Sequence, residues 1–182
     1  MNAEISNTIR VGDKYFRLFI SAEKIQETIS EIAAKMNEQL KNKKPLFIAV
    51  LNGSFLFAAD LIRQINFDCE ISFVKLSSYS GASSSGKIKE LIGLNEELKG
   101  RTVVVLEDIV DTGVTLENIS KKLLAKQVKE IKVAALLFKP HAYRKKIKID
   151  YVGMEIPNDF IIGYGLDYNG LGRNLKDIFV SV

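Results

Sequence analysis

A run of apolar and β-branched residues at positions 102–106 most constrains what this chain can fold into. The run has no polar alternation, which is typical of a strand buried on both faces of a parallel sheet. Similar runs stand at 46–51 and 131–138, with helical patterns between them. Because parallel strands need a long crossover, usually a helix, the sequence predicts a doubly wound, mainly parallel α/β sheet with 102–106 at its centre.

Acidic and small polar residues follow the central run at once. They are Glu107, Asp108, Asp111, Thr112, Gly113, Val114 and Thr115, and a helical pattern begins at 116. The order indicates a strand, an acidic loop and a helix N-terminus, where free N–H groups attract phosphate. Carboxylates beside a phosphate repel it unless they hold a divalent cation, grip sugar hydroxyls or take up a proton. A sugar phosphate bound with magnesium satisfies all of these conditions.

Residues 104–115 resemble the phosphoribosyl pyrophosphate signature of type I phosphoribosyltransferases. Their Glu-Asp-Ile-Val-Asp-Thr-Gly form is similar to that of the hypoxanthine (6-oxopurine) members. A receiver-like doubly wound domain also places paired acids at a strand end. Receivers carry that pair on their first strand, however, and here two strand–helix units come before it, so the transferase resemblance is favoured.

The remaining elements follow from periodicity and turn residues. A strand at 14–20 ends at Ser21, a helix cap, and the next helix carries one apolar stripe made of Ile25, Ile29, Ile32, Met36 and Leu40. Further strands are predicted at 46–51, 71–76, 88–91, 131–138 and near 177–182, and a helix at 55–65.

The Asn52-Gly53-Ser54 turn joins the strand at 46–51 to its helix. Taken alone it is an ordinary strand–helix turn. By position it resembles the family's first loop, in which backbone amides bind pyrophosphate, often through a cis peptide that would here be Asn52–Gly53. Many members have a basic residue where this chain has Asn52, and another where it has Val114. The resemblance therefore implies phosphate binding that depends more on amides and hydroxyls.

The segment at 77–87 is long, polar and rich in serine and glycine. Composition alone divides evenly between an irrelevant hairpin and a mobile lid. Ser78 and Tyr79 match the Ser-Tyr pair of the family's catalytic flexible loop, and this match favours the lid.

The segment at 151–173 mixes short β segments with glycines and aromatics. It resembles the C-terminal hood of the 6-oxopurine family, which implies that Phe160 stacks on the purine and Ile161 offers backbone groups. Asp167 and Arg173 would reach a metal and the pyrophosphate. On sequence alone, Phe160 beside two isoleucines is more simply explained as packed core. Lys139 follows the strand at 131–138, so its cation should point into the ligand crevice.

Composition bounds the rest. A chain of 182 residues, 47% of them hydrophobic, suits one domain over 1–182, with the hood formed by the N-terminal strand and roughly 151–182. The start lacks a signal peptide and no apolar run is long enough to span a membrane, so we expect a cytoplasmic protein. Cys69 suits a packed thiol better than a nucleophile, and His141 a solvated loop. The net charge of +4 fits a small polyanionic substrate and gives little support for nucleic acid.

The resemblance implies Mg²⁺-dependent transfer of 5-phosphoribose from phosphoribosyl pyrophosphate to N9 of hypoxanthine or guanine. The products are IMP or GMP and pyrophosphate, and a homo-oligomer, dimer or tetramer, is implied as well. Asp111 would be the general base, with Glu107, Asp108 and Asp167 near the metal. Two alternatives remain open here: a transcript-regulating binding protein like the pyrimidine-sensing relatives, marked by a dense basic face, and a pyrimidine or adenine phosphoribosyltransferase, which should lack Lys139 and the Phe160–Asp167 features.

Overall fold

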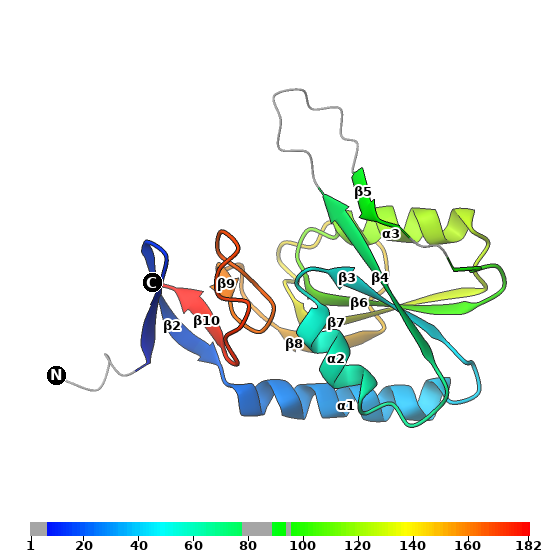
Figure 1. The fold of residues 1–182 in the computed structure, drawn as a ribbon, viewed down its shortest axis with the longest axis horizontal. Helices are drawn as coiled ribbons and strands as arrows, with labels where there is room; N and C mark the ends of the chain where they lie inside the picture. Colours follow the sequence, from blue (N-terminus) through cyan, green and yellow to red (C-terminus); the bar gives the residue numbers. More distant parts are fainter. Residues whose placement is uncertain (1–6, 78–88, 94–95) are drawn as a thin grey trace.

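The computed structural model describes residues 7–77, 89–93 and 96–182 of the chain (Figure 1). Its helices are α1 (Ala22–Leu40), α2 (Phe55–Ile62) and α3 (Val114–Ala125). Its strands are β1 (Thr8–Val11), β2 (Lys14–Ile20), β3 (Leu46–Leu51), β4 (Glu70–Ser77), β5 (Lys89–Ile92), β6 (Thr102–Val110), β7 (Glu130–Phe138), β8 (Tyr151–Glu155), β9 (Ile161–Ile162) and β10 (Ile178–Ser181).

The larger of two sheets has the strand order β5-β4-β3-β6-β7-β8. Its strands from β4 to β8 in that order run parallel, and only β5, at one edge, is antiparallel to its neighbour. Figure 1 shows α1 and α2 on one side of this sheet and α3 on the other. The predicted doubly wound, mainly parallel α/β sheet is therefore confirmed.

The central strands lack polar alternation because both of their faces are buried. Val104 and Leu106 on β6 pack in the core formed with α1 and α2, whereas Val103 and Val105 pack against α3. Residues at both the even and the odd positions of β6 thus contact apolar neighbours, as expected for a parallel sheet covered on both sides.

Helix α1 begins and packs as its sequence predicts. The Ser21 side chain caps it by accepting a hydrogen bond from the Lys24 N–H, at 3.3 Å. All five residues of the predicted stripe are buried: Ile25, Ile29, Ile32, Met36 and Leu40. The apolar stripe therefore holds the helix to the sheet.

The second sheet is antiparallel, with the order β1-β2-β10-β9. We call this sheet, together with residues 159–160 and 163–177, the hood. Phe16, Ile162 and Phe179 form its small core. Figure 1 shows the hood beside the N-terminal end of α1, apart from the larger sheet. The two ends of the described chain thus build one sheet together.

Three boundaries differ from the sequence prediction. β8, which we expected to open the hood, extends the larger sheet by pairing with β7. β6 runs on to Val110, so Glu107 and Asp108 belong to the strand and not to a loop, because β7 continues alongside and pairs with it as far as Phe138. Helix α2 ends at Ile62, where a tight turn bonds the Ile65 N–H to the Ile62 carbonyl, at 3.1 Å.

Truncating one residue of the apolar stripe of α1 should destabilise the protein. We expect Ile29→Ala to lower the free energy of unfolding by about 2–5 kcal/mol, because Ile29 is fully buried and its removal leaves a cavity. Lys35→Ala, at an exposed position on the same helix, should change it by less than about 0.5 kcal/mol. Urea denaturation of both variants measures the difference, and equal effects would contradict the packing described.

Candidate active site

The strand order reverses between β3 and β6. The strand that follows β3 in the chain, β4, lies on one side of it, whereas β7 and β8 extend the sheet on the far side of β6. The loop after β3 therefore leads to α2 on one face, and the loop after β6 leads to α3 on the other. In open α/β sheets this arrangement opens a crevice at the carboxyl ends of the two strands, where ligands bind.

A hollow of about 430 Å³ lies at that reversal point. It is lined from β3 and β4 and from the end of β6 and start of α3 by Val50, Leu51, Gly53, Leu76, Glu107, Asp108, Ile109, Val114 and Thr115. A smaller hollow of about 90 Å³ adjoins it and is lined by Glu107 and residues 109–116. The two share Glu107, Ile109, Val114 and Thr115, so they form one continuous candidate site.

The first loop differs from expectation by one residue. The cis peptide bond is Leu51–Asn52, not Asn52–Gly53. Gly53 has another function, because a Cβ at this position would overlap the Asp108 carboxylate. Glycine thus lets the first loop lie directly against the end of β6, and the resemblance had carried the cis bond over one position too late.

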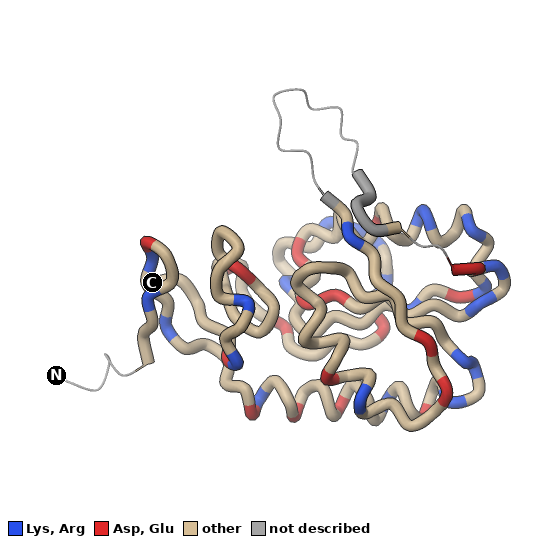
Figure 2. Tube along the Cα trace, in the orientation of Figure 1, with Lys and Arg blue, Asp and Glu red and all other residues tan. Residues whose placement is uncertain are grey.

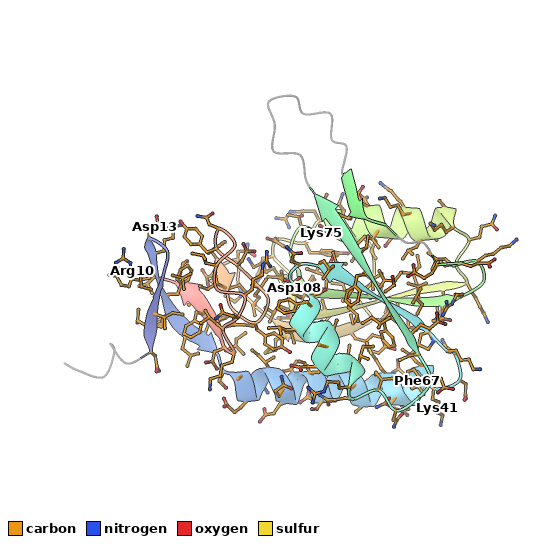
Figure 3. The ribbon with its side chains drawn as sticks, viewed as in Figure 1. Arg10, Asp13, Lys41, Phe67, Lys75 and Asp108 are labelled. Atoms are coloured by element: carbon orange, nitrogen blue, oxygen red, sulfur yellow. The ribbon has the colours of Figure 1, made fainter. Side chains whose placement is uncertain are left out.

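The two acids at the end of β6 are buried. Burial raises the pKa of Glu107 well above its ordinary value, and the neighbouring Asp108 raises it further. Burial also raises the pKa of Asp108, from 3.8 to about 6, although backbone hydrogen bonds from Ile109 and Asp108 oppose the change. Figure 3 shows Asp108 near the middle of the molecule, where the hood approaches the larger sheet. Phe67 and Lys41 lie on the side of the molecule away from the hood.

The loop at 111–115 is shaped to receive an anion. Gly113 is the N-cap of α3 with a φ of 83°, a left-handed conformation that glycine adopts without strain. The first hydrogen bond within the helix runs from the Glu117 N–H to the Gly113 carbonyl, at 2.9 Å. The N–H groups of residues 114–116 precede it and are therefore available to a ligand.

Lys139 joins this loop to the hood. It is only 7% exposed, and its Nζ donates to the Asp159 carbonyl at 2.9 Å and lies 3.9 Å from Asp111 Oδ2. Since Phe160 follows Asp159, the lysine stands between the 111–115 loop and the aromatic ring of the hood. The structure thus places Lys139 beside Asp111 of the 111–115 loop, and Lys139 is not among the described residues that line the two hollows.

The predicted hood residues also come together. Phe160 is 46% exposed, so it is not a core residue, and its ring centroid lies 6.0 Å from that of Tyr168. Ile161 is buried and pairs with Val180 of β10. Asp167 forms an ion pair with Arg173. The charge of Arg173 lowers the pKa of Asp108, and that of Asp167 raises it. These contacts bring the hood to the buried acids.

Two features were missed by sequence reasoning. Gly165 packs on the first loop so closely that a Cβ there would overlap the Gly53 carbonyl oxygen. The Tyr164 hydroxyl donates to Asp60 Oδ2 at 2.6 Å, and Gln26 donates to the same oxygen at 2.7 Å. The hood is therefore fastened to α2 and α1, and the clustered glycines at 163–172 were the signal available in the sequence.

Some expected site residues cannot be placed. Ser78 and Tyr79, and the rest of the proposed lid beyond Ser77, lie outside the described residues. Among the residues that the structure does describe, no three His, Cys, Asp or Glu side chains gather closely enough to hold a metal ion unaided. Within the same part of the chain, no helix is long and apolar enough to cross a membrane.

Comparison with known proteins first identifies the class. The model of the phosphoribosyl transferase domain matches residues 21–169. This match covers most of the sequence, and the chain belongs to the phosphoribosyl transferase family.

Relatives within the family narrow the group. The chain is 39% identical to the hypoxanthine-guanine phosphoribosyltransferase of Bacillus subtilis, over 90% of this chain and 92% of the relative. The crystal structure of the Bacillus anthracis enzyme superposes with a TM-score of 0.84 at 38% identity, over 91% of this chain and 96% of the other. A Staphylococcus aureus hypoxanthine phosphoribosyltransferase gives 0.86 at 32% identity, over 100% and 96%. The resemblance to the 6-oxopurine members is confirmed.

The raised pKa of Asp108 has a consequence for stability. The folded state binds the proton of the Asp108 carboxyl more tightly than the unfolded chain does. The contribution of this proton to the free energy of unfolding is therefore complete below about pH 4 and is lost as the pH rises through about 6. We expect Asp108→Asn, which cannot ionise, to gain up to about 3 kcal/mol over wild type between about pH 4 and pH 7.5. Urea denaturation at both pH values measures this gain.

The neighbouring Ile109→Val variant provides the control. It has no titratable group and should change the unfolding free energy equally at both pH values. A stability difference between Asp108→Asn and wild type that does not vary with pH would show that the Asp108 carboxylate ionises freely in the folded protein.

Proposed function

We propose that the chain transfers 5-phosphoribose from phosphoribosyl pyrophosphate to N9 of hypoxanthine and guanine, producing IMP or GMP and pyrophosphate. The observation that carries the proposal is that the 111–115 loop and the buried acids of β6 line adjoining hollows at the strand reversal. Lys139 links this loop to the segment before β9 through Asp111 and the Asp159 carbonyl. The Bacillus subtilis and Bacillus anthracis relatives described above are hypoxanthine-guanine phosphoribosyltransferases, which supports both bases as substrates.

The two hollows suit the two ends of the sugar donor. In the proposal the 5′-phosphate lies in the smaller hollow, against the N–H groups of α3 and the hydroxyls of Thr112 and Thr115. Pyrophosphate lies in the larger one, beside the backbone of Asn52 and Gly53 and within reach of Arg173. The ribose then spans the buried end of β6, where Glu107 and Asp108 can grip its hydroxyls.

The carboxylates present fit a magnesium ion that arrives with the donor. Mg²⁺ keeps several waters and binds through one or two carboxylates plus substrate phosphates, so the lack of a three-acid cluster in the described residues is consistent with it. Asp108 and Asp167, with Glu107, are the residues that would hold it. When bound, the ion neutralises the charge that builds on the leaving pyrophosphate.

The residues of the chain would act on the transfer in three ways. They position N9 of the base against C1 of the ribose, exclude water that would hydrolyse the sugar, and remove a proton. Asp111 lines the smaller hollow, is half exposed and lies 3.9 Å from Lys139 Nζ. It is the proposed general base for the N7 proton.

The choice of base would rest on Lys139. Its ammonium has three donors, of which the Asp159 carbonyl takes one, so two remain for the 6-carbonyl oxygen of hypoxanthine or guanine. Adenine offers an amino group there and no acceptor. Phe160 would stack on the purine, while backbone groups near Ile161 contact its 2-position.

Assembly and location complete the proposal. We include a homo-oligomer, dimer or tetramer, and a cytoplasmic site of action. The alternative of a transcript-binding regulator gains no support, because basic and acidic residues are interspersed along the larger sheet and its helices (Figure 2).

The role of Asp111 can be tested by its isosteric variant. We expect Asp111→Asn to lower kcat by about 10²-fold or more while leaving the Kd for phosphoribosyl pyrophosphate within about threefold, because an amide keeps the shape and cannot accept the proton. Asp68→Asn, at an exposed position outside the hollows, serves as the control and should retain activity. Wild-type kcat in Asp111→Asn would remove this residue from the proton transfer.

The role of Lys139 can be tested with a panel of bases. With wild type, initial rates should be high for hypoxanthine and guanine and poor for xanthine, and lower by about 10⁴-fold for adenine. Lys139→Gln carries both a donor and an acceptor, so we expect it to lose rate with hypoxanthine and to narrow the gap to adenine. Adenine used as well as hypoxanthine by the wild type would contradict the proposed function itself.

A further inference from the structure

The side chains around the 111–115 loop are acidic. Glu107 and Asp111 line the smaller hollow, and none of the described residues that line it is basic. Glu117 adds a third carboxyl in the first turn of α3. A phosphate ester bears close to two negative charges, and a helix N-terminus offers only about half of one positive charge. Backbone amides alone therefore face an unfavourable field at this site.

One cation lies against the loop from a different part of the chain. Lys145, in the connection between β7 and β8, donates from Nζ to Glu117 Oε2 at 2.9 Å. Its Cγ lies 2.9 Å from the point where a Cβ on Gly113 would stand, so its aliphatic stem runs directly beside the N-cap of α3. Glu117 is ionised here, because the hydrogen bond from Lys145 lowers its pKa.

The connection between β7 and β8 is held to the loop at several points. The Arg144 N–H donates to the Thr112 carbonyl at 3.3 Å, and the Tyr143 ring fills the space beside Gly113. The Tyr143 hydroxyl donates to the Ile147 carbonyl at 2.7 Å. Lys145 is therefore placed by packed neighbours on both sides, and its side chain is 26% exposed.

A second lysine contacts the same acid less closely. Lys121 Nζ lies 3.5 Å from Glu117 Oε2 on the solvent side of α3, and its side chain is 69% exposed. An exposed pair at this distance is weak and screened by salt. Lys145 is thus the main charge partner of Glu117 among the described residues.

We propose that Lys145 is a positioning residue for the sugar donor: by neutralising Glu117 beside Gly113, it lets the acidic 111–115 loop accept the 5′-phosphate. The inference rests on the proposed function, since it concerns the phosphate end of the same site. In this proposal, part of the affinity for the 5′-phosphate comes from the connection between β7 and β8, which lies outside the loop that contacts the phosphate.

The first test replaces the charge and keeps the stem. We expect Lys145→Met to raise the KM for phosphoribosyl pyrophosphate about tenfold, the usual size for a partly buried charge-assisted bond, with kcat and the KM for hypoxanthine within about twofold of wild type. Lys148→Met is the matched control, because Lys148 lies in the same connection, is 83% exposed and pairs with Asp150. Its KM for the donor should not change.

Rescue separates a charge effect from a packing effect. In Lys145→Met the unpaired Glu117 opposes the phosphate, so adding Glu117→Gln should return the KM for the donor to within about threefold of wild type. A packing defect would persist in the double variant. Overturning results are a donor KM in Lys145→Met within twofold of wild type, or a double variant as poor as the single one.

Binding of ribose 5-phosphate distinguishes this inference from the proposed function. Calorimetry with this probe reports the 111–115 loop without any transfer chemistry. Weaker binding by Lys145→Met than by wild type supports the role of Lys145 even if no IMP forms. Indistinguishable titrations of the two proteins overturn it, whatever the activity, whereas wild type that makes no IMP refutes only the proposed function.

Discussion

The parallel pairing of β3 with β6, from Leu46 opposite Val103 to Ala49 opposite Leu106, decides where the loops of the site can lie. Both strands are buried on both faces, so helices must cover each side, and each crossover must leave from the carboxyl edge. Because α2 and α3 depart to opposite faces, the loops before them separate at the crevice. The same constraint brings Gly53 beside Asp108.

Burial of two carboxyls at the end of β6 shapes the rest of the site. An ionised carboxylate without a partner is unfavourable in such a place, and the raised pKa values of Glu107 and Asp108 express that cost. The hood brings Arg173 near them, and the donor would bring its metal ion. A ligand that supplies positive charge therefore reduces the cost of ionising these buried carboxyls, and this reduction contributes to its binding free energy.

Sequence reasoning recovered what local patterns determine. The apolar runs predicted the parallel strands, and Ser21 with the stripe of Ile25 to Leu40 predicted α1. Lys139 follows its strand as predicted and lies beside Asp111. It failed where distant segments meet. Nothing local to Tyr151–Glu155 distinguishes an edge strand of the larger sheet from a hood strand, and the contact of Gly165 with Gly53 joins residues far apart in the chain. The Lys145–Glu117 pair was invisible for the same reason, since a basic run in a loop is usually only solvated.

The hood has a consequence for synthesis on the ribosome. Every strand of the larger sheet is encoded before position 156, whereas the hood needs β10, Ile178–Ser181, placed between β2 and β9. At about 5–20 residues per second, β10 is synthesised about 1–5 seconds after β8. Until β10 is made, β2 lacks its partner on one side, and Phe16 lacks Phe179, which packs with it in the core of the hood. The nascent chain thus completes the hood last, and its N-terminal strands wait longest for their full set of partners.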